Sequence, residues 1–331
     1  MPGASSGPVL RLECAVSRYW LLALALAVVA HDWQLPQFKG RTDTVVVWAS
    51  VLGMDGSVIK DLRPEEVELA EDGKKREIVQ FSLEERPITV AFLVDNSPSL
   101  TSSKDPDTSP WKRWQRSAIE SVIAGLRFGD QASLGTLSRR IEGLTGDGRR
   151  LLTALSRPLT RDELSPVWAA IEREVNGLEH ATGQRAVLVF TDALNNQARS
   201  SNPDAIGKLA QKTVVSVYAA VMQMPNTISS FGSSPQHQAS GTRIDNRDSK
   251  DELAVQQLSD LARATGGRSI FFRWTPEVEK VFKGITDELR YRYVLGFRAE
   301  NLDGKYHTLR IRTSRPGASV TARAGYLAWG K

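Results

Sequence analysis

The order of hydrophobic and polar positions divides the chain into three parts. In the first, residues 45–50 and 66–69 alternate between the two kinds of side chain, as half-buried strands do, and residues 78–81 return to strand character. The pairs Asp55-Gly56 and Asp72-Gly73 lie between these stretches and predict tight turns. So small a group of strands lacks a core and would not be stable alone.

The middle part contains unbroken apolar runs. Residues 88–94, 186–191 and 214–221 are of strand length, and such runs are typical of strands buried on both faces of a parallel sheet. Between them, apolar residues recur with a helical period over residues 111–126 and 167–175. Strands that alternate with helices predict an α/β fold with a doubly wound, mostly parallel sheet.

The remainder of the chain contains one more helical stretch and a second β-rich region. Residues 253–262 predict a helix that ends before Gly266-Gly267, and the polar residues 224–250 predict a long surface loop. Each β-rich flank is short of a core, so we expect the two flanks to pack together as a small domain, with the α/β domain inserted between them. The strands expected in the second flank are residues 291–297, 305–313 and 319–327.

The N-terminus predicts export. Arg11 and Arg18 precede the apolar residues 19–30, which are too few to span a bilayer comfortably and end in small side chains. The alternative is an uncleaved membrane anchor. We expect the protein in the periplasm, in the cell envelope or outside the cell. The organisation predicted for the chain is a signal peptide at 1–30, a linker at 31–43, an N-terminal β-rich segment at 44–86, the α/β domain at 87–290 and a C-terminal β-strand segment at 291–331.

Composition and charge argue against several classes of function. Hydrophobic residues make up 41% of the chain and charged residues 24%, which are ordinary globular proportions. The net charge of +5 is spread over interleaved acidic and basic residues without a basic stripe, so nucleic acid is not an expected partner. The single cysteine, Cys14, excludes an intrachain disulfide, and the scattered histidines argue against a zinc site.

The residues that could bind a ligand lie where two of the apolar runs end. Asp95, Ser97 and Ser99 follow the first run, and Asp192 follows a later one. Because ligands bind beyond the carboxyl ends of the strands in open α/β sheets, we expect these oxygen donors to converge. A small hard cation such as Mg²⁺ prefers oxygen ligands. Two carboxylates neutralise such an ion only weakly, so an acidic group of a partner could complete its coordination shell. The alternative interpretation is helix capping or turn formation, for which Asp and Ser are common.

The Asp-x-Ser-x-Ser spacing that begins at Asp95, with Asp192 after a later strand, resembles the metal-ion-dependent adhesion site of von Willebrand factor A domains. The resemblance implies that the serine hydroxyls bind the metal directly and that Asp192 acts through water. It also implies a threonine from a third loop. Ser165 takes that position here, with Thr160 as the alternative.

The segments outside this motif are similar to the lead-in and tail of the bacterial VWFA-related family typical of Acidobacteria. The chain departs from the family at the site itself. Ala193 follows the second aspartate where many members have glycine, and Asp162-Glu163-Leu164 stands where Gly-Gly is expected. Asp105 and Asp107 add acids nearby. The family-like segments are residues 69–82, 293–297, 303–307 and 324–326.

These features together predict an exported protein that binds a protein partner presenting an acidic side chain, with membrane contact only through an uncleaved anchor. An enzyme is not expected, since no predicted strand leads into a Gly-x-Ser-x-Gly elbow or a Gly-x-x-x-x-Gly-Lys-Ser/Thr loop. The alternatives are a structural envelope protein with a vestigial metal site and a metal-dependent phosphate-ester hydrolase. The expected ligands of the cation, Mg²⁺ or else Mn²⁺ or Ca²⁺, are Asp95, Ser97, Ser99, Ser165 and Asp192.

Overall fold

A computed structural model describes part of the 331-residue chain. The predicted signal peptide at 1–30 and linker at 31–43 lie outside the described residues, as do Ser99, Thr160 and the acidic residues of the 101–109 stretch. No described helix is long and apolar enough to cross a membrane. The described residues are 44–97, 100, 110–159, 162, 165–193, 202–222, 246–272, 278–300 and 302–328.

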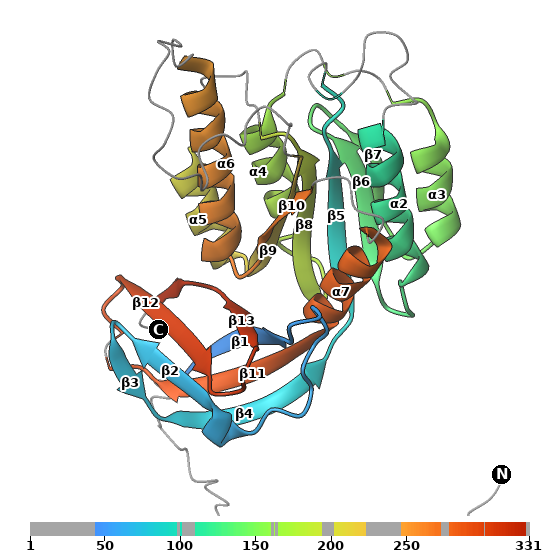
Figure 1. Ribbon diagram of the computed structural model, residues 1–331. Coiled ribbons are helices and arrows are strands. Elements are labelled where there is room, and N and C mark those ends of the chain that lie inside the picture. Colours follow the sequence, from blue (N-terminus) through green and yellow to red (C-terminus); the bar gives the residue numbers. More distant parts are fainter. Residues whose placement is uncertain are drawn as a thin grey trace, which may run out of the picture. The chain divides into compact units, whose positions relative to one another are not determined.

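The centre of the fold is a six-stranded sheet, whose strands are β5 (Ile88–Val94), β6 (Gln131–Thr136), β7 (Arg140–Thr145), β8 (Gln184–Thr191), β9 (Val215–Met222) and β10 (Ser269–Phe272). Its order is β10-β9-β8-β5-β6-β7, and all strands are parallel except β7 at one edge (Figure 1). Every residue of β5 is buried, as expected for a strand covered on both faces. The predicted α/β fold with a mostly parallel sheet is confirmed.

Helices cover both faces of this sheet (Figure 1). One face carries α2 (Pro110–Ala124), α3 (Gly148–Ser156) and α7 (Val278–Arg290), and the other carries α4 (Val167–Gly177), α5 (Pro203–Lys212) and α6 (Asn246–Ala264). Successive residues of β5 enter different cores. Val90 and Phe92 join the core under α2, α3 and α7, whereas Ala91 and Leu93 join the core under α4, α5 and α6. This is the two-residue period of a strand.

Some observed elements are not predicted by the apolar pattern, namely the strands β6, β7 and β10 and the helices α3, α5 and α7. In β6 the buried Ser133 and Thr136 interrupt the apolar run, so hydrophobicity does not mark the burial. Helix α5 begins at a polar cap, where Asn202 accepts a hydrogen bond from the backbone nitrogen of Asp204 over 2.9 Å.

Two predicted boundaries are wrong. The surface loop expected at 224–250 overlaps α6, which begins at Asn246, while residues 223–245 lie outside the described part of the chain. The strand expected from Val214 begins one residue later, because Val214 has a φ of 54°. That left-handed conformation is rare for a β-branched residue and places Val214 in the turn before β9.

The β-rich flanks pair with each other in two four-stranded antiparallel sheets, which we call the β-sandwich. The N-terminal strands are β1 (Thr44–Leu52), β2 (Val67–Glu71), β3 (Lys74–Arg76) and β4 (Ile78–Glu85), with a 3₁₀ turn at Pro64–Glu66. The C-terminal strands are β11 (Tyr291–Arg298), β12 (Tyr306–Thr313), β13 (Ser319–Ala322) and β14 (Gly325–Leu327). The sheet orders are β13-β1-β11-β4 and β14-β12-β2-β3. Both sheets contribute to one core that includes Val47, Leu69, Tyr293 and Phe297.

One predicted strand of the second flank is two strands. Residues 319–327 divide into β13, which pairs with β1, and β14, which pairs with β12 in the other sheet. The predicted turn at Asp72-Gly73 joins β2 to β3, with φ of 47° and 79°, the left-handed pair that a tight hairpin of the I′ type requires.

The chain enters and leaves the α/β domain at neighbouring points. The backbone nitrogen of Arg86 donates to the carbonyl of Arg290 over 3.0 Å, just where β4 and β11 run side by side. The guanidinium of Arg290 then reaches Asp130 at 2.7 Å, in an ion pair whose side chains are 3% and 0% exposed. Asp130 also accepts from the backbone nitrogen of Ile88 over 2.9 Å, so this pair anchors the first residue of β5.

A second buried connection joins β9 and α7 to β11. Tyr218 donates to a carboxylate oxygen of Glu288 over 3.1 Å, and Arg268 holds the other oxygen at 3.0 Å. Arg292 of β11 donates in turn to the Tyr218 hydroxyl over 3.3 Å. Burial, followed by the neighbouring charge of Glu288, raises the pKa of Tyr218, so its hydroxyl keeps the proton that it donates.

Candidate functional site

The candidate site lies where β5 and its neighbour β8 end. The two strands are parallel and in register, with Val94 beside Phe190, so the residues that follow them reach the same edge of the sheet. The backbone nitrogen of Asp95 continues the ladder by donating to the carbonyl of Phe190 over 2.9 Å. Asp95 and Asp192, which the sequence places after these strands, therefore lie at one edge, and both are buried.

The carboxylate of Asp95 is the centre of a hydrogen-bond cluster. Its Oδ1 accepts from the backbone nitrogen of Ser97 over 3.0 Å. Its Oδ2 accepts from the hydroxyl of Thr191 over 2.6 Å and from that of Ser165 over 3.2 Å. These donors come from three separate segments, and each residue of the cluster is at most 2% exposed. The fold thus brings Asp95, Ser97 and Ser165 together as the sequence predicts, and it adds Thr191.

Two effects in this cluster shift the pKa of Asp95 in opposite directions. Burial raises the pKa of Asp95, and the hydrogen bonds from Ser97, Thr191 and Ser165 counteract that rise. No ion pair with a lysine, arginine or histidine of the described residues balances the charge of Asp95. A buried carboxylate that is held by hydroxyls and lacks a cationic side chain is suited to a bound cation.

The hydroxyl groups can serve the carboxylate and a cation at the same time. A serine or threonine hydroxyl donates one hydrogen bond and keeps lone pairs on its oxygen. Ser165 uses its proton on Asp95. The side chains described at the site offer oxygen atoms as ligands, which fits Mg²⁺, Mn²⁺ or Ca²⁺. Within the described residues, no group of at least three His, Cys, Asp or Glu side chains forms a cage by itself, so hydroxyls, water or a partner would have to complete the shell.

Sequence reasoning treats Asp162 only as a departure from the family pattern, yet it is buried beside the site. Its side chain is anchored by the Thr136 hydroxyl, which donates to Oδ1 over 3.1 Å, and its backbone nitrogen donates to the carbonyl of Asn96 over 3.3 Å. Asp162 is 3% exposed, and its Oδ2 has no hydrogen-bond partner. An acid at a position where glycine is expected is the signal that could have marked it.

Ala193 occupies a backbone position of the kind that favours glycine. Its φ is 64°, in the left-handed region, and it is 3% exposed. An alanine there costs about 1 kcal/mol relative to glycine. Its backbone nitrogen donates to the hydroxyl of Thr191 over 3.0 Å, and that hydroxyl in turn donates to Asp95. The left-handed turn therefore orients the threonine that holds the central carboxylate.

The other predicted site residues are only partly accounted for. Asp192 is buried next to Thr191, with 6% exposure. Ser99, the alternative residue Thr160, and Asp105 and Asp107 lie outside the described residues.

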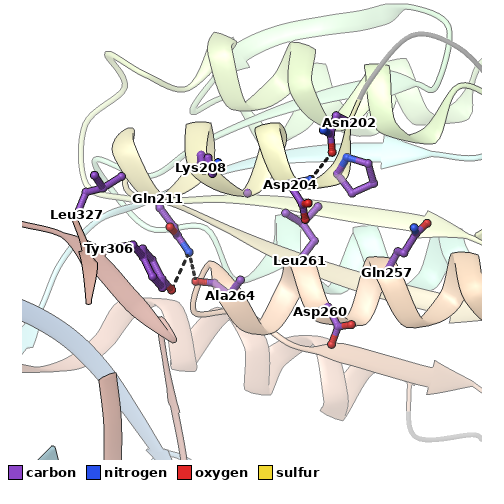
Figure 2. Close-up of a pocket in the computed structure, with 12 residues that line it drawn as sticks. Asn202, Asp204, Lys208, Gln211, Gln257, Asp260, Leu261, Ala264, Tyr306 and Leu327 are labelled. Atoms are coloured by element: carbon purple, nitrogen blue, oxygen red, sulfur yellow. Dashed lines mark hydrogen bonds between the residues drawn. The ribbon is translucent and has the colours of Figure 1, made fainter. Parts of the chain in front are cut away.

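A separate hollow lies between α5 and α6, next to the β-sandwich (Figure 2). Its volume is about 700 Å³. Gln211 crosses one end of it and donates to the carbonyl of Ala264 over 3.1 Å and to the hydroxyl of Tyr306 over 3.4 Å. None of the residues at the ends of β5 and β8 lines it. The lining residues are Asn202, Pro203, Asp204, Gly207, Lys208, Gln211, Gln257, Asp260, Leu261, Ala264, Tyr306 and Leu327.

No family model matches the sequence, and no curated protein matches it. Among solved structures, proximal thread matrix protein 1 from the mussel byssus is 12% identical over 72% of this chain, with a TM-score of 0.45. This chain spans 50% of that protein's length. A further structure of the mussel protein has a zinc-occupied MIDAS motif.

Two other solved structures are similar at the same level. The manganese-loaded TRAP protein of Plasmodium vivax is 12% identical over 74% of this chain and 97% of its own, with a TM-score of 0.37. The ArnB paralog VWA2 of Sulfolobus acidocaldarius is 9% identical over 85% of this chain and 76% of its own, with a TM-score of 0.41. Similarity this distant carries no information on function, which has to follow from the residues of this chain.

Proposed function

We propose that this protein binds a protein partner through a divalent cation held at the carboxyl ends of β5 and β8. The observation that carries the proposal is the convergence of three segments on the buried carboxylate of Asp95, which accepts hydrogen bonds from Ser97, Ser165 and Thr191. The Asp-x-Ser-x-Ser resemblance to von Willebrand factor A domains supports the same interpretation. The residues that would hold the cation are Asp95, Ser97, Ser99, Ser165 and Asp192.

When bound, the cation supplies a positive point at the protein surface that attracts an anionic oxygen. The chain's own contribution is to position hydroxyl and carboxylate oxygens and to leave part of the shell open. A partner's Asp or Glu side chain is the complementary group, because a carboxylate is the ligand that hard cations prefer. Mg²⁺ is the preferred ion on this basis, with Mn²⁺ and Ca²⁺ as alternatives that share its oxygen chemistry.

The proposal includes export, which the basic and apolar N-terminal residues support. The protein then acts in the periplasm, in the cell envelope or outside the cell. Any membrane contact is through an uncleaved N-terminal anchor. Interleaved acidic and basic residues without a basic stripe support a protein partner over a nucleic acid.

A binding role is favoured over catalysis by the surroundings of the hydroxyl groups. Nucleophilic catalysis by serine needs an activating base, which in a serine–histidine pair is an imidazole. The acceptor of the Ser165 proton is the carboxylate of Asp95. Of the histidines in the described part of the chain, His307 binds Asp72 and Asp303 in the β-sandwich, and His180 is exposed in the turn before β8.

Cation binding by the full-length protein tests the proposal. Isothermal titration with Mg²⁺ and with Mn²⁺ should show binding that Asp95→Ala removes, while circular dichroism confirms that the variant stays folded. Asp204→Ala, which removes an exposed acid at the start of α5, is the matched control and should bind as wild type does. Absence of cation binding in the wild type would overturn the proposal and favour a structural envelope protein with a vestigial site.

A partner search follows the same logic. Extracellular and envelope proteins retained by the immobilised chain in Mg²⁺ should be released by a chelator. Retention that persists in excess chelator, and that Asp95→Ala leaves unchanged, would contradict a cation-dependent mechanism and point to pairing along a strand edge instead.

A further inference from the structure

A small cavity lies where the β-sandwich meets the amino end of β9. Trp48 of β1, Arg292 of β11 and Arg323, which follows β13, line it from the β-sandwich. Ser216 of β9 and Gly266, which follows α6, line it from the other side. The volume of the cavity is about 20 Å³, which is enough for one water-sized occupant. The proposed cation site is separate, because it lies at the carboxyl ends of β5 and β8.

Strand register explains why these side chains meet the central sheet. Trp48 pairs with Val294 of β11, and Arg292 is two residues from Val294. Because successive side chains of a strand point to opposite faces, Trp48 and Arg292 share one face of the sheet. Val47, the neighbour of Trp48, is fully buried in the core of the β-sandwich. The tryptophan and the arginine therefore lie on the face that turns away from that core.

Arg292 and Arg323 carry positive charges that no carboxylate balances directly. Arg292 is 7% exposed and donates to the hydroxyls of Ser216 and Tyr218, each over 3.3 Å. Arg323 donates to the carbonyl of Val46 over 2.8 Å, and burial lowers its pKa. Neither guanidinium forms an ion pair within the part of the chain that the structure describes.

The acid connected to this group is Glu288, which is fully buried. One of its carboxylate oxygens is 3.0 Å from Arg268, and the other accepts from the Tyr218 hydroxyl, to which Arg292 donates. A single carboxylate thus serves Arg268 directly and Arg292 only through a tyrosine. Buried positive charge without an anionic partner is costly, so the cavity is suited to an anion.

The cavity-lining residues also provide hydrogen-bond donors that have no acceptor. Nε of Arg292, Nε of Arg323 and Nε1 of Trp48 are buried and have no hydrogen-bond partner among the described residues. Each of these nitrogens can only donate. Native proteins usually satisfy such groups with water or an ion. Water would accept hydrogen bonds without neutralising the arginines, whereas an anion does both. About 20 Å³ is too small for phosphate, sulfate or a carboxylate side chain.

We infer that this cavity binds a single chloride ion, which accepts hydrogen bonds from Arg292, Arg323 and Trp48. The ion holds the β-sandwich to the central sheet, because its donors come from the β-sandwich and Ser216 of β9 lies on the other side of the cavity. This anion site is independent of the proposed cation site, and neither needs the other to be occupied.

Thermal unfolding of the full-length protein tests the inference. The solutions contain chelator and have constant ionic strength, with sodium chloride replacing sodium gluconate, whose anion is too large for the cavity. A ligand that binds only the folded state raises its stability with the logarithm of the ligand concentration. Above half-saturation, Tm should therefore rise by about 2–3 °C for each tenfold increase in chloride.

Two substitutions locate the effect. Arg323→Gln removes one charge, and Trp48→Phe keeps an aromatic ring while it removes the indole N–H. Each should raise the half-saturating chloride concentration about tenfold or more, because a hydrogen bond to a charged group is lost. Arg185→Gln and Trp111→Phe are the matched controls, which should keep the wild-type dependence on chloride. Arg185 is a partly buried arginine that donates to the carbonyl of Leu178, and Nε1 of Trp111 is likewise buried without a partner, but neither residue lines the cavity.

The outcomes decide between chloride and other occupants. Equal Tm values of the wild type in chloride and in gluconate would overturn the inference and indicate water in the cavity. A chloride-dependent rise that stays unchanged in either Arg323→Gln or Trp48→Phe would place the ion elsewhere and overturn it as well. If Arg323→Gln does not fold, Trp48→Phe alone decides. Because no divalent cation is present, failure of the proposed cation site would not alter these results.

Discussion

Thr191 donates a 2.6 Å hydrogen bond to Oδ2 of Asp95, and its oxygen accepts at the same time from the backbone nitrogen of Ala193. The last residue of β8 thus fixes the central carboxylate of the neighbouring strand. Thr191 is fully buried. It is the residue through which β8 controls the orientation of a group on β5.

Replacement of Thr191 by valine should affect both stability and cation binding. Thr191→Val removes the hydroxyl and leaves a buried amide and a buried carboxylate short of one partner each, which should cost about 1–3 kcal/mol. Mn²⁺ affinity should fall as well, because Asp95 loses the hydrogen bond that orients it. Urea denaturation in chelator and Mn²⁺ titration measure the two effects.

A matched control exists on β5 itself. Thr89 is also fully buried and donates one hydrogen bond, to the carbonyl of Thr182 over 2.8 Å, at the end of the strand away from the site. Thr89→Val should lower stability without changing Mn²⁺ affinity. If both variants lost affinity alike, the loss would reflect general destabilisation, and the orienting role of Thr191 would be wrong.

The junction of the β-sandwich and the central sheet should be sensitive to loss of one charge. Asp130→Ala leaves the buried guanidinium of Arg290 without its carboxylate, and breaking a buried pair in this way costs about 3–5 kcal/mol. The midpoint of urea unfolding reports the loss. Asp260→Ala breaks the exposed pair with Arg263 and should change stability by less than about 1 kcal/mol. Equal effects of the two substitutions would contradict the importance of burial at the junction.

Val214 offers a stabilising substitution. Its φ of 54° strains a β-branched side chain that is 39% exposed and therefore adds little to the core. Asparagine tolerates the left-handed region, so Val214→Asn should stabilise the protein by about 0.5–1 kcal/mol. Val79→Asn, on an exposed position of β4 with ordinary strand geometry, should be neutral or destabilising. Thermal unfolding of both variants is the measurement, and a lower Tm for Val214→Asn would refute the strain.

The β-sandwich should show a pH dependence that comes from His307. Its Nδ1 lies 2.6 Å from Asp72 and its Nε2 lies 3.0 Å from Asp303. The hydrogen bonds to Asp303 and then to Asp72 raise the pKa of His307. A raised pKa in the folded state adds stability that is complete below the unfolded value of about 6.5 and is lost as the pH rises through the folded pKa.

Tm measured from about pH 6 to pH 8.5 should therefore fall more steeply in wild type than in His307→Gln. His180→Gln, at an exposed histidine, is the control and should keep the wild-type slope. The carboxylates act at the other end of the scale. The backbone hydrogen bond from Thr308, followed by the contact with His307, lowers the pKa of Asp72, and the contact with His307 lowers that of Asp303. Their contribution is therefore present above their ordinary value of 3.8 and is lost as the pH falls through the folded pKa. Parallel Tm curves for wild type and His307→Gln would rule out the histidine contribution.

The sequence predicts those parts of the fold in which the buried residues are hydrophobic. Strand β5 is buried on both faces and reads as an unbroken apolar run, so its place in a parallel sheet is predictable. Strand β6 escapes prediction because Ser133 and Thr136 are polar residues that are buried in the folded state, where Thr136 donates to Asp162. Tertiary context decides such segments.

The candidate site divides in the same way. Asp95 and Ser97 can be named from spacing, since they follow the end of β5, whereas Ser165, which lies just ahead of α4, can be named only from the resemblance. Thr191 becomes visible only through the contact that it makes across strands, which no local pattern contains. The left-handed φ of Ala193 lies in the region that favours glycine, so this chain tolerates the strain of a side chain there.

The interleaved β-sandwich sets the order in which the chain can fold. Tyr326 bonds to Glu71 from 255 positions away, whereas the central strands pair mainly within their own domain. Contacts of such long sequence separation form slowly, because a large loop must close first. Strands β1 to β4 leave a ribosome or a translocation channel well before their partners β11 to β14 exist. They remain open edges until the end of synthesis, and a chaperone that shields them in that interval would reduce aggregation.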